Sequence, residues 1–251
     1  MVTFAALSPP MERNIIITSD GSKSLYLPEW DETYHSRHGA VQEAYHVFIR
    51  NGLDLFEPGS ELRILEMGFG TGLNCFITWL ESRQRGLTVY YHGLEAYPVA
   101  PNVAQHLDYP SALGQAQHKK VFEALHSCKW DEKVQITQNF TLFKAQEQFS
   151  DFDPTKSDDP TETHDPTEGH ETTKNFDLIY FDAFAPRVQP ELWSESMFQV
   201  MYEALRNEGV LVTYSAKGSV RRSMQAVGFS VERLPGPPGK REMLRATKPP
   251  K

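Results

Sequence analysis

The segment from Arg63 to Asn74 constrains the fold of this chain more than any other stretch. A short apolar run predicts a buried strand, three glycines at alternate positions (Gly68, Gly70 and Gly72) predict a turn, and Leu73 begins a helical pattern. Alternate glycines let the backbone pass close to a ligand, and the start of the helix offers unpaired N–H groups. The segment therefore predicts a strand, a ligand-binding turn and a helix.

The residue before the glycines indicates which ligand the turn would bind. The order is Glu66-x-Gly68-x-Gly70-x-Gly72, whereas the dinucleotide fingerprint reads G-x-G-x-x-G and suits a pyrophosphate. A carboxylate suits a cationic ligand, and S-adenosylmethionine carries a sulfonium and an ammonium but no phosphate. The motif favours S-adenosylmethionine as cofactor; the alternative is an ordinary turn between a strand and a helix.

A second acidic residue follows the next predicted strand. The helix from Leu73 ends at Gly86, and the β-branched and aromatic residues 87–94 predict a strand that ends at Glu95. An acid at the end of the second strand of a βαβ unit accepts hydrogen bonds from ribose hydroxyls. We expect Glu95 to bind the cofactor in this way, the alternative being a solvated glutamate.

Length and composition predict one large domain without a membrane segment. The chain has 251 residues, of which 39% are hydrophobic, enough for a full core. Its apolar runs are too short to span a bilayer, and residues 1–7 lack the basic flank of a signal peptide. The two cysteines, Cys75 and Cys128, form no disulfide framework and fit a reducing cytoplasm. We expect a cytoplasmic protein that does not bind membranes.

The net charge of −8 is unevenly distributed along the chain. Residues 151–174 hold eight acids and two lysines, repeat Asp-Pro-Thr every six residues and have almost no large apolar side chains, which predicts a disordered insertion. His164 and His170 in this stretch do not predict a metal site. Residues 206–251 hold ten Lys or Arg and three Glu, a net +7 that suits a polyanion if these residues share a face. A solvated basic surface is the alternative.

A third strand is predicted for residues 176–181, whose nearly continuous apolar run is typical of a central parallel strand. It ends at Asp182, followed by Phe184 and Pro186. We expect this strand to lie beside the strand of the glycine turn. Asp182 could then orient an amine next to a methyl donor, or could instead cap a turn.

Five further motifs occur in order along the chain. They are DETYHS at 31–36, DAFAP at 182–186, PELW at 190–193, GVLVTYSAKGSVRR at 209–222 and GPPGKREML at 236–244. Together they resemble the methyltransferase domain of the MnmC family. The resemblance runs from about Tyr26 to Ala246, with the acidic insertion as its main gap.

The resemblance implies transfer of a methyl group from S-adenosylmethionine to the 5-aminomethyl group of the wobble uridine of tRNA, forming 5-methylaminomethyl(-2-thio)uridine. Full-length members carry a second, FAD-dependent domain that first removes a carboxymethyl group. This chain has no room for that domain, so it resembles a stand-alone methyltransferase that depends on separate enzymes to install the aminomethyl group. The strand at 140–147 departs from the pattern, because Gln146 stands where many such enzymes place an adenine-contacting aspartate.

The resemblance also suggests roles for individual residues. Asp182 is the candidate catalytic residue, which would hydrogen-bond the acceptor amine and accept its proton. Aromatic and proline side chains would contact the splayed-out wobble base, namely Phe184, Pro186 and Trp193, although core packing is the rival interpretation for Trp193. Basic side chains would contact phosphates of the anticodon stem-loop, namely Arg221, Arg222, Lys240 and Arg241. Arg222 or Arg241 could instead pair with Glu242.

The predicted fold is α/β, a Rossmann-like class I S-adenosylmethionine-dependent methyltransferase. Its sheet would be doubly wound and mostly parallel, with an antiparallel C-terminal hairpin formed by residues 229–234 and 242–246. Residues 1–57 would form an N-terminal extension packed on a methyltransferase domain at 58–251. Two other functions stay open: a transferase that methylates or aminopropylates a small amine, and a catalytically inactive tRNA-binding protein.

Overall fold

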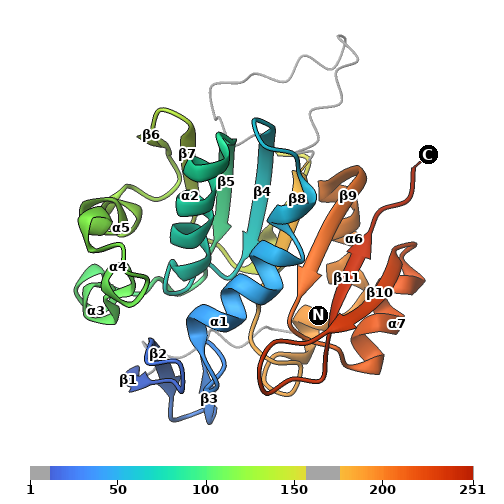
Figure 1. Cartoon of the computed structure of the whole chain (residues 1–251). Coiled ribbons are helices and arrows are strands. Elements are labelled where there is room, and N and C mark those ends of the chain that lie inside the picture. Colours follow the sequence, from blue (N-terminus) through green and yellow to red (C-terminus); the bar gives the residue numbers. More distant parts are fainter. Residues whose placement is uncertain (1–11, 157–175, 251) are drawn as a thin grey trace.

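The computed structural model describes residues 12–156 and 176–250. A central sheet carries helices on both faces (Figure 1). Among the described residues this sheet has eight strands, in the spatial order β10-β11-β9-β8-β4-β5-β7-β6. Their bounds are β4 Glu61–Met67, β5 Thr88–Leu94, β6 Lys133–Thr137, β7 Phe140–Ala145, β8 Phe176–Phe181, β9 Leu205–Thr213, β10 Ser230–Pro235 and β11 Glu242–Thr247.

The five central strands, β9, β8, β4, β5 and β7, are parallel to one another. At the edges, β6 is antiparallel to β7, β11 is antiparallel to β9, and β10 is antiparallel to β11. The strands expected at 87–94 and 176–181 and the C-terminal hairpin are present within a residue or two of their predicted bounds. β8 lies beside β4, as expected, with Phe181 opposite Met67. The prediction of a doubly wound, mostly parallel sheet is confirmed.

Two groups of helices cover the two faces. One face carries α1 Ala40–Ala44 with its π-helical continuation Tyr45–Arg50, α2 Leu73–Arg85, α3 Pro101–Leu107, α4 Tyr109–Ala112 and α5 Lys119–Ser127. The other carries α6 Glu195–Ala204 and α7 Gly218–Ala226. Short 3-10 turns occupy Leu53–Leu55, Ala116–His118, Phe149–Asp151 and Pro190–Trp193.

The alternation of side chains along each central strand divides the core into two clusters. In β4, Ile64 packs in the cluster of α2, whereas Leu65 and Met67 pack in the cluster of α6. In β8, Tyr180 packs in the cluster of α2 and Phe181 packs in the cluster of α6. Successive residues of a strand point to opposite faces, so strands that are apolar at nearly every position require helices on both sides.

The chain reverses its winding direction between β4 and β8. From β4 it continues outward through β5 to β7, whereas β8 lies on the other side of β4 and continues to β9. In open α/β sheets a crevice forms beyond the carboxyl ends of the strands at such a switch point. The glycine turn after β4 and Asp182 after β8 both lie at this crevice.

A small antiparallel sheet lies beyond the carboxyl ends of the main strands (Figure 1). It consists of β1 Asn14–Ile17, β2 Lys23–Leu27 and β3 Glu32–Thr33. The segment that follows β3 reaches the glycine turn, because a Cβ atom on Gly70 would lie 3.2 Å from the Tyr34 ring. Residues 12–38, here called the N-terminal segment, therefore cover the crevice rather than extending away from it.

Most of the predicted acidic insertion lies outside the described residues. Its first residues, 151–156, are described: Phe152 is only 4% exposed and packs 5.8 Å from the His92 ring, and Pro154 is buried. One phenylalanine can anchor a segment whose average composition is polar. No helix in the described residues is long and apolar enough to cross a membrane.

Candidate active site

The glycine turn after β4 has a backbone that other residues adopt only with strain. Gly68, Gly70 and Gly72 have φ values of 101°, 49° and 70°, in the left-handed region. A Cβ atom on Gly68 would lie 2.8 Å from the Asp182 carbonyl oxygen, and one on Gly72 would lie 2.8 Å from Nε2 of His126. The glycines therefore allow the turn to pack directly against the end of β8 and against α5.

Glu95 holds the glycine turn in place from the end of β5. Its Oε2 accepts a hydrogen bond from the Gly70 N–H at 2.9 Å, and its Oε1 accepts one from the Tyr97 N–H at 2.8 Å. The side chain lines the cavity and is 9% exposed. Burial raises the pKa of Glu95, whereas these backbone hydrogen bonds lower it. Each carboxylate oxygen has a second lone pair, which leaves acceptor capacity for ligand hydroxyls.

Glu66, the acid of the glycine motif, does not line the cavity. Its carboxyl is fully buried, and Oε1 accepts a hydrogen bond from the Asn74 amide at 3.0 Å. The same Asn74 nitrogen donates to Oδ2 of Asp182 at 2.9 Å. Burial, followed by the charge of Asp182, raises the pKa of Glu66 well above its usual range. Glu66 therefore acts on the site through Asn74, a residue that the sequence motif did not single out.

Asp182 lies directly after β8, where its backbone N–H donates to the Met67 carbonyl at 3.0 Å. Burial, followed by the charge of the nearby Glu43 carboxylate, raises the pKa of its carboxyl to about 7. The hydrogen bond from Asn74 and the charge of Lys240 act in the opposite direction. A carboxyl group with this proton affinity can gain or lose a proton near neutral pH, as a general base must.

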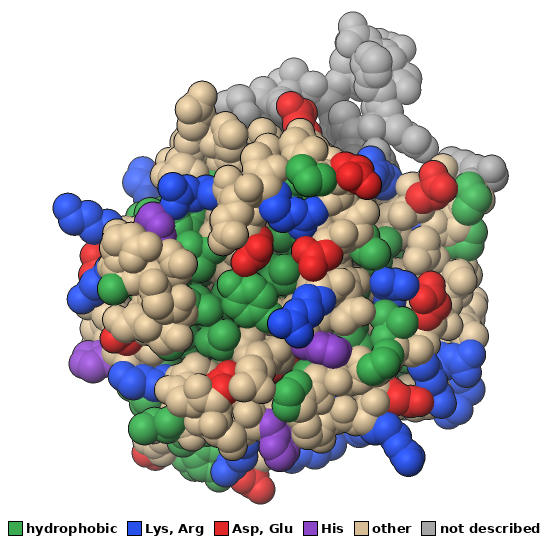
Figure 2. All heavy atoms as spheres, in the orientation of Figure 1, with side chains coloured by type: hydrophobic (Ala, Val, Ile, Leu, Met, Phe, Trp, Pro, Cys, Tyr) green, Lys and Arg blue, Asp and Glu red, His purple; other side chains and the backbone are tan. Residues whose placement is uncertain are grey.

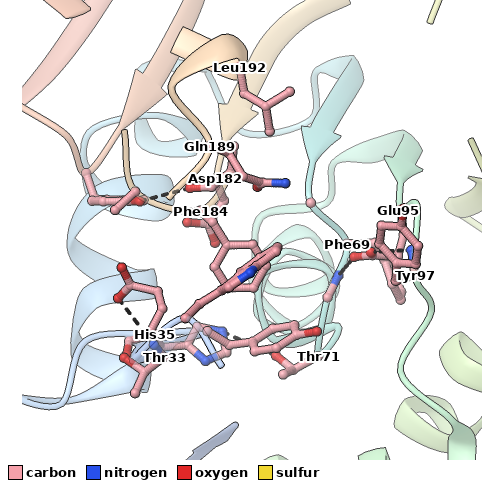
Figure 3. Close-up of a pocket in the computed structure, with 18 of the residues that line it drawn as sticks. Thr33, His35, Phe69, Thr71, Glu95, Tyr97, Asp182, Phe184, Gln189 and Leu192 are labelled. Carbon is pink, nitrogen blue, oxygen red and sulfur yellow. Dashed lines mark hydrogen bonds between the residues drawn. The ribbon is translucent and has the colours of Figure 1, made fainter. Parts of the chain in front are cut away.

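One cavity of about 1010 Å³ is lined by Glu95, Asp182 and the glycine turn at Gly68 and Gly70. Asp182 and Phe184 lie on one side of it, and Glu95 and Tyr97 lie on the other (Figure 3). Residues of the N-terminal segment complete the wall: Arg13, Trp30, Asp31, Glu32, Thr33, Tyr34, His35, Ser36 and Arg37. Burial lowers the pKa of His35 to about 4, so this imidazole is neutral at pH 7. Sequence reasoning assigned no site residue to this segment, because its contact with the glycine turn is long-range.

Three aromatic rings form one part of the wall. Phe184 packs edge-on against Trp30 at 5.3 Å and against Tyr34 at 5.1 Å. Trp193 is a different case, because its ring is 4% exposed and packs against Phe181 in the core. Its indole N–H donates to the Phe184 carbonyl at 2.8 Å. Trp193 therefore supports the loop, and Trp30 supplies the cavity tryptophan.

Three further candidate residues lie outside the cavity wall. Gln146 and Gln148 are both exposed, and of the two Gln148 lines the cavity. The wall includes both neighbours of Pro186 but not Pro186 itself, and it does not include Gly72. The sequence predicted the strand end near Gln146 correctly but not which side chain turns inward after it.

The basic candidates divide between cavity and surface. Lys240 lines the cavity and pairs there with Glu43. Arg221, Arg222 and Arg241 lie outside its wall, and Arg222 and Arg241 are exposed. Because α7 follows the carboxyl end of β9 and β11 runs antiparallel to β9, these arginines lie on the crevice side of the sheet. Basic side chains gather over α7 and β10 (Figure 2).

Other cations of the C-terminal region are paired. Arg206 pairs with Asp177 at 2.8 Å, Arg245 with Glu232 at 2.9 Å and Arg233 with Glu242 at 3.6 Å. In the described residues, Glu242 thus pairs with Arg233 rather than with Arg222 or Arg241. The net +7 of this region therefore overstates the charge that a polyanion would meet. Within the described part of the chain, no cluster of His, Cys, Asp and Glu could hold a metal ion.

The cavity fits a cationic nucleoside cofactor. Of its two strand-end carboxyls, Glu95 is buried and Asp182 is half-buried, and neither forms an ion pair in the described residues. A buried carboxylate without a counter-ion favours a cationic ligand. The glycine turn leaves room for close approach of the backbone, and Glu95 retains acceptor capacity for ribose hydroxyls. S-adenosylmethionine has the charge and the hydroxyls that these groups match.

Known proteins resemble this chain in sequence. A family model described as S-adenosyl-L-methionine-dependent methyltransferase matches residues 165–249. Two relatives share the name tRNA 5-methylaminomethyl-2-thiouridine biosynthesis bifunctional protein MnmC. The protein from Cupriavidus metallidurans is 30% identical over 245 residues, which are 92% of this chain and 33% of that protein. The protein from Cupriavidus necator is 31% identical over 234 residues, which are 88% of this chain and 32% of that protein.

This chain therefore spans about one third of the length of those relatives. The crystal structure of MnmC2 from Aquifex aeolicus has the same fold, with a TM-score of 0.69 and 24% identity over 96% of this chain and 73% of that one. This chain is similar to the MnmC proteins over about nine tenths of its length and to an S-adenosyl-L-methionine-dependent methyltransferase family over residues 165–249, and S-adenosylmethionine is its cofactor.

Proposed function

We propose that this protein transfers a methyl group from S-adenosylmethionine to the 5-aminomethyl group of the wobble uridine of tRNA. The observation that carries the proposal is Asp182, a carboxyl with a pKa of about 7 beside the glycine turn in a cavity walled by aromatic rings. The names of the MnmC relatives support tRNA as the substrate. The acceptor amine would be made by a separate enzyme, and the location would be the cytoplasm.

Two groups would position the cofactor and the amine. When bound, S-adenosylmethionine supplies a methyl group on a positively charged sulfur. Glu95 would hold the ribose hydroxyls at one side of the cavity, and Asp182 would accept a hydrogen bond from the amine at the other. Holding a nucleophile in line at near contact supplies much of the rate enhancement of such transfers.

Asp182 would also manage the proton of the reaction. The amine must be neutral to attack, since an ammonium has no lone pair, and it becomes positively charged when the new N–C bond forms. Asp182 would take the proton that the methylated nitrogen then loses. Asn74 would hold the carboxylate in orientation through its hydrogen bond to Oδ2. Phe184 and Trp30 would contact the splayed-out base.

The test is methyl transfer to tRNA that carries 5-aminomethyluridine, followed by mass spectrometry of the nucleosides. We expect the wild-type protein to produce 5-methylaminomethyluridine. Asp182→Asn should lower the maximal rate by roughly a hundredfold or more while changing cofactor affinity, measured by calorimetry, by no more than a few fold. Methylation of free polyamines but not of this tRNA would contradict the proposed substrate. Wild-type rates in Asp182→Asn would contradict the role of Asp182.

A further inference from the structure

Lys240 lies in the cavity wall, and its contacts differ from those of a phosphate-binding lysine on a surface. It pairs with Glu43, whose side chain is only 8% exposed. Its Nζ also lies 3.8 Å from the centre of the Tyr214 ring. The attraction between an ammonium and both a carboxylate and an aromatic face holds the lysine in one position. A phosphate contact would require Lys240 to leave both partners.

The elements that carry this pair are fixed against one another. The Tyr214 hydroxyl donates to the Ala183 carbonyl at 2.9 Å, next to Asp182. Oε2 of Glu43 accepts a hydrogen bond from the Ser36 N–H at 2.7 Å. Gly239 packs directly on the His38 ring, since a Cβ atom there would lie 1.9 Å from Cδ2. The loop between β10 and β11 is therefore closely packed on the N-terminal segment at Lys240.

The charges around Asp182 come from several elements. Glu43 on α1 and Glu66 on β4 are carboxyls, Lys240 is the cation, and Tyr214 after β9 has a hydroxyl whose pKa is raised well above its usual value by burial. Two carboxylates beside an amine would favour its protonated form, which cannot attack a methyl group. Lys240 offsets the charge of Glu43 at the point where the amine would bind.

We propose that Lys240 is a positioning residue for methyl transfer, paired with Glu43 so that the acceptor amine meets the charge of Asp182 alone. The inference rests on the proposed amine acceptor. It assigns Lys240 a role inside the active site, in place of the anticodon-phosphate contact expected from its sequence position. Removing the Lys240 ammonium would leave the negative charge of Glu43 without a counter-charge beside Asp182. Removing the charge of Glu43 as well would restore the wild-type net charge next to Asp182.

The first test measures Asp182 itself and needs no substrate. Carboxyl-carbon NMR would follow its titration, with Asp182→Asn identifying the signal. We expect the midpoint to rise by about one pH unit in Lys240→Met, to fall in Glu43→Gln and to return toward the wild-type value in the double variant. Lys240→Met keeps the length of the side chain. Lys129→Met, which removes an exposed lysine paired with Glu132, is the matched control and should leave the midpoint unchanged.

The second test measures the pH dependence of kcat/KM with tRNA carrying 5-aminomethyluridine. The acidic limb should shift to higher pH in Lys240→Met, with a loss of about fivefold at pH 7 that the added Glu43→Gln reverses. A phosphate contact would instead raise KM and weaken its salt dependence, without a pH shift or rescue, and would overturn the inference. An unchanged NMR midpoint in Lys240→Met would also overturn it. Absence of methyl transfer by the wild type would reject the proposed function. The NMR titration would still show whether Lys240 offsets the effect of Glu43 on Asp182.

Discussion

The proton affinity of Asp182 links catalysis to stability at the level of one residue. Its pKa of about 7 in the folded protein is above that of an aspartate in the unfolded chain. Between about pH 4 and 7 the folded state therefore binds a proton that the unfolded state has released, so stability falls as pH rises through this window. We expect Asp182→Asn to lose this part of the pH dependence and to be more stable than the wild type at pH 8. Urea unfolding at pH 5 and 8 measures the free energy of unfolding of both proteins. An identical pH dependence in the wild type and in Asp182→Asn would contradict this prediction.

Glu95 is the residue whose loss should affect the cofactor most directly. Glu95→Gln keeps the size of the side chain but removes the charge. The amide nitrogen of glutamine accepts no hydrogen bond, so a single oxygen would have to accept from the Gly70 N–H, the Tyr97 N–H and the ribose hydroxyls. We expect the dissociation constant of S-adenosylmethionine to rise about tenfold or more. Calorimetric titration measures the change. Glu123→Gln, a substitution on α5 outside the cavity wall, is the control, and an equal effect of both variants would remove Glu95 from the site.

At the level of elements, Arg187 connects the loop after β8 to the N-terminal segment. Its guanidinium donates to the carbonyls of Trp30 at 3.2 Å and Asp31 at 2.5 Å, and it pairs with Glu32 at 3.0 Å. Arg187→Ala should loosen residues 30–34 without weakening the main sheet, because the hydrogen bonds and the ion pair of its side chain in the described residues are with Trp30, Asp31 and Glu32. Hydrogen exchange should accelerate at 30–34 and stay unchanged in β4 and β8. Equal acceleration in the sheet would show that Arg187 supports the whole fold.

At the level of the whole molecule, the basic surface beside the crevice should bind tRNA through its phosphates. Arg222 and Arg241 are exposed on the crevice side of the sheet. Each phosphate contact contributes about one unit to the slope of log affinity against log salt concentration. The double variant Arg222→Ala, Arg241→Ala should therefore weaken tRNA binding and lower this slope by about two, with little change in rate at saturating tRNA. Arg83→Ala, on the helix α2, is a control that should retain the wild-type slope.

Much of the sheet could be predicted from the sequence because its signals are local. Strands that are apolar at nearly every residue, such as 176–181, require cover on both faces, and Gly86 in the left-handed region ends α2 as expected. The glycine turn and the two strand-end acids, Glu95 and Asp182, follow from the same reasoning, since parallel strands place their carboxyl ends at one edge. Sequence alone thus determined the fold class and the location of the site.

Only the tertiary structure decided which side chains face the cavity. The sequence motifs indicated Trp193, and not Trp30, for the site, but packing places Trp193 in the core and Trp30 in the wall. Glu66 is held away from the cavity by Asn74, and Lys240 turns inward to Glu43 across 197 residues of sequence. These outcomes depend on contacts between segments that are distant in the sequence, and on which buried charged groups form hydrogen bonds or ion pairs there. Local patterns do not contain that information, because burial free energy is determined only when the segments meet.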